Sequence, residues 1–572
     1  MSNFMATDLV SYTLRYNPND EDKPVLIDAL DDRNRSSRRQ VRKLVHSLID
    51  ALRNRGIKPG DTVCLHMFNH IHFPALFLAI VGAGAKFTAS NPAYTEWELV
   101  NHLRLSDTSW IITEHILLSN VHGAIRHNGL PCGRVLLHTE DSELESSCSS
   151  HATLSQLLDD AAGKTIDNGT DHGPEDGPDK RLEDRTDKRS DNRPDSGSDM
   201  ETDRDIDTEV CAQPGNYSVM SPDTIATLSS TSGTTGLPKM AARSHYSLII
   251  EAETIEDSVP KPYEIRRLLS IPFFHAFAAP LALINALRFG HTTYVMRRFD
   301  QTQYLDAIQR FDITETAMPP PLIFKFQEMP VTEREMLKSL RQVWCGGAPL
   351  SATVQNKALD MFAPDARIVQ VWGMTETGWL TTFKYPEFDT TGSVGRLVSS
   401  YQARVVDEIG NVLQPNHLGE ILVQGPATMA GYIRNPDANT LIFRDGWLRT
   451  GDLGYIDEDN KIYVVDRSKE LIKVRGWQVA PAEIEGRLLE HPSIIDAAVI
   501  GVFCREKGTE IPRVHVVYRQ DYQPLTSEIL MEYLKQSLAR YKVSDCEFYT
   551  VASIPRSASG KILRRLLRDQ FE

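Results

Sequence analysis

One stretch of the chain carries most of the fold prediction: Ser229-Ser230-Thr231-Ser232-Gly233-Thr234-Thr235-Gly236-Leu237-Pro238-Lys239. Every residue in it except Leu237 is hydroxyl-bearing, Gly, Pro or Lys. Backbone N–H groups freed by glycine, with flanking hydroxyls and a lysine, suit a polyphosphate. The loop is not a Walker A motif, because Met240 rather than Ser or Thr follows Lys239. The order of residues favours a phosphate-binding loop over an ordinary loop rich in Ser, Thr and Gly.

The sequence on both sides of this loop alternates between helical and extended patterns. Apolar residues from Val41 to Leu52 recur at helical spacing, and a turn at Gly56–Gly60 leads into an extended Thr62–Met67. Short apolar runs at Arg134–His138 and Val369–Trp372 are typical of buried strands. The alternation predicts doubly wound α/β units.

The pattern changes twice towards the carboxyl end. Beyond about Arg396, brief strands separated by turns predict a small β-barrel or sandwich, of which we take the barrel. After about Arg467, a helix, two strands and a long amphipathic helix over Ser527–Tyr541 predict a compact α+β domain. We therefore expect an α/β protein in which residues 1–465 form a large N-terminal domain, with two doubly wound subdomains and the barrel, and residues 466–572 form a C-terminal domain.

An acidic segment interrupts the N-terminal domain. Residues 164–209 carry sixteen acidic and eight basic side chains and almost no aliphatic ones. Such a segment cannot bury enough apolar surface to offset the entropy lost on ordering, so we expect a disordered insert. A surface loop is the simpler interpretation, and an acidic interaction segment is the alternative.

Composition excludes several classes of protein. The net charge of −15 argues against a protein that binds duplex nucleic acid through a basic face. The apolar run at Phe73–Phe87 is too short, and too interrupted by Gly and Lys, to span a membrane. Seven scattered cysteines indicate reduced thiols, and neither a signal peptide nor an SKL-type terminus is present, so we expect a cytoplasmic protein.

Six further motifs follow the phosphate loop in order. They are Gly346-Gly347-Ala348-Pro349, Trp372-Gly373-Met374-Thr375-Glu376, Thr450-Gly451-Asp452, Asp466-Arg467-Ser468-Lys469-Glu470, Lys473-Val474-Arg475-Gly476-Trp477-Gln478 and Pro555-Arg556-Ser557-Ala558-Ser559-Gly560-Lys561. With the phosphate loop they resemble the adenylate-forming superfamily, which includes acyl-CoA synthetases and 4-coumarate–CoA ligase-like enzymes. The resemblance runs from about Val25 to Arg568, apart from the acidic insert.

The resemblance implies an ATP site and a magnesium ligand. Glu376 would hold Mg2+, Thr375 would donate to phosphate, Asp452 would accept the ribose hydroxyls, and Trp372 would stack on adenine. The remaining nucleotide-binding residues would be Thr231, Ser232, Gly233, Thr234, Thr235, Gly236, Lys239, Gly347, Ala348, Pro349, Gly373 and Arg467.

The resemblance also implies a lysine that catalyses adenylation and a C-terminal domain that rotates. Lys561 would bridge the attacking carboxylate and the AMP oxygen, because its long stem carries a compact charge. For the second half-reaction the C-terminal domain would turn about a hinge at Lys469. Lys473 would then contact the acyl-adenylate, and Arg475, Gly476 and Gln478 would line the CoA tunnel. An amphipathic basic strand is the alternative interpretation of this segment.

Substrate recognition is predicted around His275. The block Pro272–Phe277 resembles the part of acyl-CoA and aryl-CoA ligases that borders the acyl pocket, and no acidic residue occurs between Ile271 and Phe299 to hold an amino group. His275 is a gate, a base or a packed core histidine. The predicted pocket consists of His275, Ala276, Phe277, Gly346, Trp379 and Leu380.

The sequence thus predicts a ligase that uses ATP, Mg2+ and CoA. It would convert an apolar or aromatic carboxylic acid to acyl-AMP and then to acyl-CoA, in secondary metabolism. Two alternatives remain: an adenylating ligase that loads a separate carrier protein, and a non-catalytic scaffold that keeps the fold.

Overall fold

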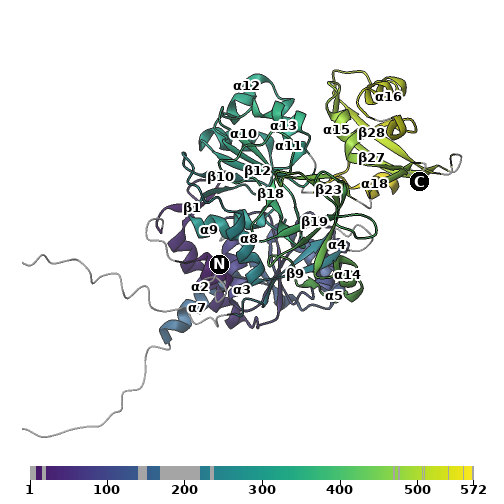
Figure 1. Cartoon of the computed structure of the whole chain (residues 1–572). Helices are drawn as coiled ribbons and strands as arrows, with labels where there is room; N and C mark the ends of the chain where they lie inside the picture. The colour runs from purple at the N-terminus through teal and green to yellow at the C-terminus, as the bar shows by residue number, and fades with distance from the viewer. Residues whose placement is uncertain are drawn as a thin grey trace, which may run out of the picture.

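The computed structural model describes most of the chain. The described residues are 8–15, 21–139, 151–167, 220–231, 238–348, 350–467, 470–474, 477–504, 507, 509–538, 540–557 and 560–569. Two large sheets and a smaller antiparallel sheet build the N-terminal part, and a separate domain with a three-stranded sheet follows (Figure 1). This mixed α/β architecture confirms the predicted fold class.

The first large sheet has eight strands and carries the phosphate-loop hairpin at one side. Its parallel strands β4, β3, β5 and β6 are flanked by helices in the order typical of a doubly wound fold. Its strands, in spatial order, are β21 (Gly431–Tyr432), β9 (Lys239–Ser244), β8 (Ile225–Thr231), β4 (Lys86–Ala89), β3 (Thr62–His66), β5 (Trp110–Glu114), β6 (Val135–His138) and β7 (Ala152–Thr153).

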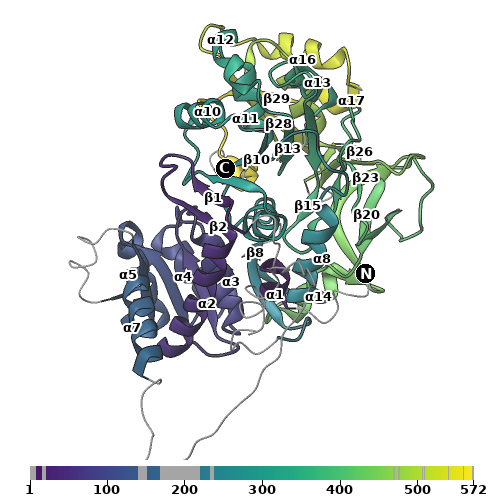
Figure 2. The ribbon, with the colours of Figure 1, turned by 90° about the vertical axis from the view of Figure 1, so that its left-hand side faces the viewer.

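The second large sheet has seven strands, and Figure 2 shows it above the first sheet, with α10, α11, α12 and α13 around it. All its pairings are parallel except that of β1 with β2. Its strands are β14 (Arg367–Val371), β13 (Gln342–Gly346), β12 (Glu315–Met318), β10 (Arg266–Leu269), β11 (Thr292–Val295), β1 (Pro24–Asp28) and β2 (Arg35–Ser37). The helices are α10 (Gln301–Arg310), α11 (Pro320–Gln327), α12 (Val331–Arg334) and α13 (Ala352–Leu359).

A five-stranded antiparallel sheet stands where the sequence predicts the β-barrel. It comprises β19 (Gln402–Val406), β20 (Gly419–Gln424), β22 (Phe443–Arg444), β23 (Trp447–Ile456) and β24 (Ile462–Arg467). The C-terminal domain packs α15 (Pro481–Leu489), α16 (Ser527–Lys535) and α18 (Arg564–Asp569) around β27 (Ile494–Cys504), β28 (Thr509–Tyr518) and β29 (Glu547–Thr550).

Local sequence signals explain the helices of the first subdomain. Helix α2 (Arg38–Arg55) begins with a capping box between Ser37 and Gln40 and ends at Gly56, whose φ of 103° suits a residue without a side chain. Helix α3 (Phe73–Gly82) is apolar on all sides, and all its residues are buried. It packs against α2 and the π-helix Pro280–Asn285, which explains why the apolar run at Phe73–Phe87 lies in the core. No helix in the described part of the chain is both long and apolar enough to cross a membrane.

Two predictions of local structure need correction. The helix expected over Ser527–Tyr541 ends at Lys535, and a second short helix, α17, covers Arg540–Val543. Helix α7 (Leu154–Asp167) runs four residues into the segment expected to be disordered, because its apolar spacing continues beyond Leu158. The rest of that acidic segment, residues 168–209, lies outside the described residues.

The side chain of Asn69 joins the two large sheets. It donates to the carbonyl oxygens of Ile271 (3.0 Å) and Met296 (3.1 Å), and it accepts from the backbone N–H of Phe273 (2.9 Å). Asn69 follows β3 of the first sheet, whereas Ile271 and Met296 follow β10 and β11 of the second. This buried amide therefore ties together the carboxyl ends of the two sheets.

Buried neutral histidines make folding depend on pH. Burial lowers the pKa of His66 to about 4, and burial with His66 nearby lowers that of His102 to about 3. An unfolded histidine titrates near 6.5, so the unfolded chain binds more protons below this pH. We expect stability to fall between pH 6.5 and about 4, by about 1.4 kcal/mol per pH unit for each such histidine.

Urea unfolding at pH 7, 6 and 5 measures this effect. A His102→Gln variant keeps a polar side chain opposite Thr88 Oγ1. Its free energy of unfolding should depend less steeply on pH, by about 1.4 kcal/mol per pH unit, which corresponds to one proton. An unchanged slope in the variant would rule out His102 as a source of the pH dependence.

Candidate active site

The phosphate loop joins two strands of the first sheet. Thr231, the last residue of β8, pairs with Lys239, the first residue of β9. The side chain of Thr231 is buried, and the ammonium of Lys239 lies 5.1 Å from the ring centre of Tyr432. Residues Ser232, Gly233, Thr234, Thr235 and Gly236 lie outside the described residues. The structure thus places both ends of the predicted loop on one rigid antiparallel pair.

Glu376 lies beside these strand ends. The hydroxyl of Tyr432 donates to Glu376 Oε1 at 2.6 Å, and the Glu376 carbonyl accepts from the N–H of Met429. Tyr432 pairs with Ala241 of β9 through strand β21, so the carboxylate of Glu376 is tied to the phosphate-loop hairpin. A buried carboxylate held this way is a hard oxygen donor, which fits Mg2+.

The turn that carries Thr375 and Glu376 is built on glycine. It connects β15 (Gly373–Met374) to β16 (Gly378–Trp379). Gly378 has a φ of +71°, and a Cβ on it would lie 2.1 Å from Glu251 Oε1. Any other residue would therefore be strained and would displace a buried carboxylate.

Asp452 is bound by the indole of Trp372. The Nε1–H of Trp372 donates to Asp452 Oδ2 at 2.8 Å, and both side chains are buried. In the register of β23 and β24, Asp452 pairs with Arg467. The resemblance implies that Trp372 stacks on adenine, but it did not predict this hydrogen bond. Tyrosine and phenylalanine have no indole N–H and could not make it.

Four predicted pocket residues meet in space. The rings of Phe277 and Trp379 lie 5.7 Å apart, and the indole N–H of Trp379 donates to the Phe277 carbonyl at 3.1 Å. A Cβ on Gly346 would lie 3.2 Å from the Phe277 ring, so Gly346 forms part of the same wall. Leu380, the next residue in the chain after Trp379, is fully buried, and the ring of Trp344 lies edge-on to that of Trp379.

His275 is neutral and its tautomer is fixed by the backbone. Its Nδ1 accepts from the N–H of Phe277 at 3.2 Å, which leaves the ring proton on Nε2. Burial, with a smaller contribution from the Lys561 ammonium, lowers the pKa of His275 to about 4. A ring with this pKa is a weak base near neutral pH. With its Nδ1 already accepting a hydrogen bond, we expect His275 to act as a hydrogen-bond donor through Nε2 rather than as a general base.

The Lys561 loop docks on the second subdomain. Ser557 and Lys561 are joined by hydrogen bonds in both directions, and Arg556, which binds Asp496, also donates to the Gly560 carbonyl. Gly560 has a φ of +84°, and a Cβ on it would lie 2.9 Å from Pro319. The Lys561 ammonium also lies close enough to His275 to contribute to the lowering of its pKa.

The other predicted residues are placed as follows. Gly347, with a φ of +90°, and Ala348 follow strand β13, while Ala276 is half-buried beside His275. Lys473 and Gln478 are partners in the backbone register of β25 (Ile472–Val474) and β26 (Trp477–Val479). Pro349, Lys469, Arg475 and Gly476 lie outside the described residues.

Two supporting residues were missed by the sequence analysis. Tyr432 belongs to the pair Gly431-Tyr432, which resembles a further block of the adenylate-forming superfamily, so it could have been named. Glu251 could not have been named, because it lies in helix α8 (His245–Ile255), outside every motif. Only the fold brings it to the site, where it accepts from the N–H of Trp379 and pairs with Arg243.

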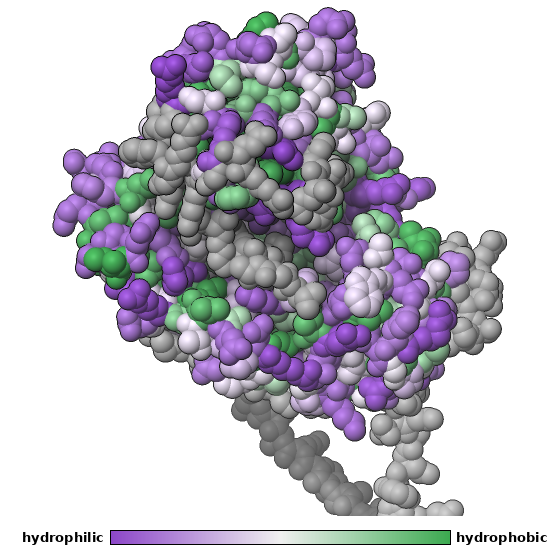
Figure 3. All heavy atoms as spheres, turned by 90° about the vertical axis from the view of Figure 1, so that its right-hand side faces the viewer, coloured by the Kyte–Doolittle hydropathy of each residue, from purple (hydrophilic) through white to green (hydrophobic). Residues whose placement is uncertain are grey.

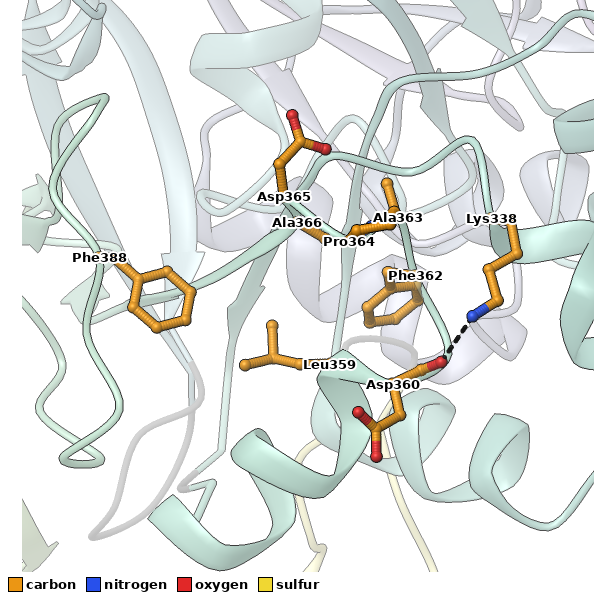
Figure 4. Close-up of a pocket in the computed structure, with 9 residues that line it drawn as sticks. All are labelled: Lys338, Leu359, Asp360, Phe362, Ala363, Pro364, Asp365, Ala366 and Phe388. Carbon is orange, nitrogen blue, oxygen red and sulfur yellow. Dashed lines mark hydrogen bonds between the residues drawn. The ribbon is translucent and has the colours of Figure 1, made fainter.

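A surface cavity lies elsewhere. Its volume is about 400 Å³, and it is lined by Lys338, Leu359, Asp360, Phe362, Ala363, Pro364, Asp365, Ala366 and Phe388 (Figure 4). Lys338 donates to the Asp360 carbonyl at its edge. None of the predicted site residues lines this cavity.

The face of the molecule on the side of the C-terminal domain mixes hydrophilic and hydrophobic side chains, with the hydrophobic ones in separate patches (Figure 3).

Solved structures share this fold over the whole chain. The anthranilate CoA ligase AuaEII in complex with anthranoyl-AMP matches with a TM-score of 0.80 at 20% identity, over 100% of this chain and 98% of that one. ATP-bound MatB from Rhodopseudomonas palustris matches with a TM-score of 0.77 at 23% identity, over 99% of each chain. These likenesses establish the class of fold.

The family follows from the sequence comparisons. Residues 15–433 match the AMP-binding enzyme family, and residues 483–561 match the AMP-binding enzyme C-terminal domain. The chain is 39% identical to the phenylacetyl-CoA ligase epaB of Aspergillus niger, over 98% of this chain and 96% of the relative. It is 38% identical to the acyl-CoA ligase azaF of Aspergillus niger, over 98% and 97%. This protein belongs to the AMP-binding enzyme family.

The hydrogen bond between Trp372 and Asp452 gives a testable prediction. Trp372→Phe keeps an aromatic ring but removes the N–H donor to a buried carboxylate, a loss of about 1.5 kcal/mol. We expect the KM for ATP to rise about tenfold, measured by ATP–pyrophosphate exchange.

Trp379→Phe is the matched control, since its indole N–H binds the Phe277 carbonyl instead. It should change the KM for the acid and leave that for ATP within about twofold of wild type. Equal effects of both variants on ATP would show that the Trp372 result reflects general damage.

Proposed function

We propose that this protein is an ATP-dependent acyl-CoA ligase that activates an apolar or aromatic carboxylic acid. Relatives at 38–39% identity over almost the whole chain carry the names phenylacetyl-CoA ligase and acyl-CoA ligase. The single structural observation that carries the proposal is the docking of Lys561 beside His275, at the predicted acyl pocket. The names of these relatives favour CoA over a carrier protein as acceptor.

The proposed reaction has two steps. A carboxylate oxygen attacks the α-phosphorus of ATP, the bond to the β-phosphate oxygen breaks, and pyrophosphate leaves. The CoA sulfur, having lost its proton, then attacks the acyl carbon, and AMP leaves with the electron pair of the broken C–O bond. Charge builds up on oxygens throughout, so positioned donors and cations lower the barrier.

We assign roles to this chain's residues on that basis. Lys561 neutralises the attacking carboxylate and the α-phosphate, Thr231 to Gly236 with Lys239 and Thr375 hold phosphate, and Asp452 accepts from the ribose. Glu376 would bind Mg2+, which neutralises phosphate charge when present. His275 donates from Nε2 to the acyl group. Gly347, Ala348, Pro349, Trp372, Gly373 and Arg467 border the nucleotide, while Gly346 belongs to the acyl pocket.

The proposed second half-reaction uses the segment around the domain boundary. We infer that the N-terminal domain ends near residue 465 and that Lys469 is the hinge. Lys473, Arg475, Gly476 and Gln478 would face CoA after rotation. A cytoplasmic location stays a prediction of the sequence.

The aromatic wall supports the proposed substrate class. Phe277, Trp379 and Trp344 present tilted or edge-on rings rather than charges, which favours an acid with an apolar or aromatic body. Phe277 has no hydroxyl to recognise a phenol. We therefore expect aryl acids of the phenylacetic or cinnamic type to be better substrates than amino acids.

A panel of acids tests the function. Phenylacetic, benzoic, cinnamic, medium-chain and amino acids are incubated with ATP and Mg2+, with CoA present or omitted. We expect acyl-CoA from one apolar or aromatic class and acyl-AMP when CoA is omitted. Acyl-AMP that never transfers to CoA would overturn CoA as acceptor, and no turnover with any acid would contradict the proposed substrate class.

Lys561→Ala tests the catalytic lysine. We expect acyl-AMP formation to fall by at least about 100-fold, because a cation beside developing charge is lost. Thioester formation from supplied acyl-AMP should persist. Lys535→Ala, a lysine at the end of α16, is the control and should behave like wild type. Unchanged adenylation in Lys561→Ala would refute the assignment.

Gly346→Ala tests the pocket wall. The added Cβ would lie 2.9 Å from the Val371 carbonyl and 3.2 Å from Phe277, so the wall must shift. We expect the KM for the preferred acid to rise about tenfold or more, with the KM for ATP much less affected. Gly133→Ala, where a Cβ meets no atom within 4 Å, is the control. A larger effect on ATP than on the acid would place Gly346 outside the acyl pocket.

A further inference from the structure

Three histidines gather at one edge of the eight-stranded sheet, in a cluster that the adenylation chemistry does not use. His70 and His72 lie in the loop between β3 and helix α3, and His138 is the last residue of β6. In the sheet β5 lies between these two strands, so the three side chains collect around its carboxyl end. One ligand nitrogen from each imidazole lies within 4.8 Å of the other two.

The distances suit a shared metal ion. His72 Nδ1 lies 3.2 Å from His138 Nε2, and the His70 ring centre is 4.9 Å from that of His72 and 4.5 Å from that of His138. Zinc–nitrogen bonds of about 2.0–2.1 Å at tetrahedral angles hold two nitrogens about 3.4 Å apart. The His72–His138 pair therefore already has nearly the spacing of two ligands.

The donor set selects the class of ion. The neighbouring carboxylate, Glu114 at the end of β5, is engaged by Arg297 and by the N–H of Phe68. Among the described residues, three imidazoles are then the available ligands. Imidazole nitrogen favours Zn2+, Co2+, Ni2+ or Cu2+, whereas Mg2+ and Ca2+ prefer oxygen.

The ligands are unequal. His72 and His138 point nitrogens at each other, and His138 is buried. The Nδ1 of His70 accepts from the N–H of His72 at 3.1 Å, which places the ring proton on Nε2. To bind a metal, His70 must give up this bond or shift its proton, so it should contribute less affinity.

We propose that His70, His72 and His138 bind one divalent transition-metal ion, with Zn2+ as the reference ion. The site is separate from Glu376, where Mg2+ is proposed. It would fasten the loop after β3 to β6. Asn69, next to His70, binds the backbone of Ile271 and Phe273, so the same ion would also brace the segment that leads to His275.

Metal titration of the full chain tests the site. Protein without a polyhistidine tag is stripped with chelator and titrated with ZnCl2 in calorimetry, with bound metal counted by elemental analysis after desalting. We expect one equivalent of Zn2+ per chain and a higher unfolding temperature with the metal bound. A wild-type protein that retains no stoichiometric Zn2+ would overturn the proposal.

Variants separate this site from adventitious binding. His138→Ala and His72→Gln should each weaken Zn2+ binding by about 100-fold, and His70→Ala by about tenfold. His122→Ala is the control: His122 and His151 form a pair with nitrogens 2.8 Å apart, and no third ligand joins them among the described residues. It should bind Zn2+ like wild type.

Two readouts guard against misfolding. The unfolding temperature of each metal-free variant should match that of metal-free wild type, and its ATP–pyrophosphate exchange should persist. His72→Gln keeps a polar side chain at a half-buried position, so it stays informative if His138→Ala does not fold. Stoichiometric binding of equal affinity in His72→Gln and wild type would refute the site.

Discussion

The buried ion pair between Arg243 and Glu251 is the interaction on which the site depends. Arg243 lies in β9, the strand that follows the phosphate loop, and its guanidinium donates to Glu251 at 2.6 Å and to the Ala427 carbonyl at 3.1 Å. Glu251 also accepts from the N–H of Trp379, directly after the Glu376 turn. One ion pair thus fixes three segments that are far apart in sequence: the phosphate-loop hairpin, the turn with Glu376 and the segment leading to Tyr432.

Such a pair is costly to assemble and more costly to break. Both side chains are almost fully removed from water, and removal of one partner would leave an unpaired buried charge, at a cost of about 3–5 kcal/mol. The same carboxylate explains Gly378, because a Cβ there would collide with Glu251. The turn with Glu376 therefore needs Gly378 because of Glu251, which lies in helix α8, far away in the sequence. One network of buried groups around Arg243 and Glu251 therefore sets the positions of the phosphate-loop hairpin and the Glu376 turn, rather than separate motifs.

The division between predicted and unpredicted features follows from this network. Strands such as Val135–His138 and the helix Arg38–Arg55 were predictable because their apolar spacing and caps are local. The proposed site residues were named because they lie in contiguous motifs that resemble a family. Asn69 and Glu251 carry no local signal: an isolated amide and an isolated carboxylate acquire their partners only when distant strands meet. The break after Lys535 was also missed, since amphipathic spacing continued through it.

The docked C-terminal domain places a cation beside a neutral imidazole, and this combination restricts the chemistry. Gly560 approaches Pro319 so closely that a side chain would not fit, and Arg519 pairs with Glu328 across the same boundary. Lys561 thereby lies near His275, whose Nδ1 is already occupied by the Phe277 N–H. A protonated His275 would repel Lys561, whereas a neutral ring with its proton on Nε2 can donate to a carboxylate that also attracts the lysine. Burial of His275 and docking of the lysine loop therefore favour the same state, which is the one that the proposed binding of an anionic acid by both groups requires.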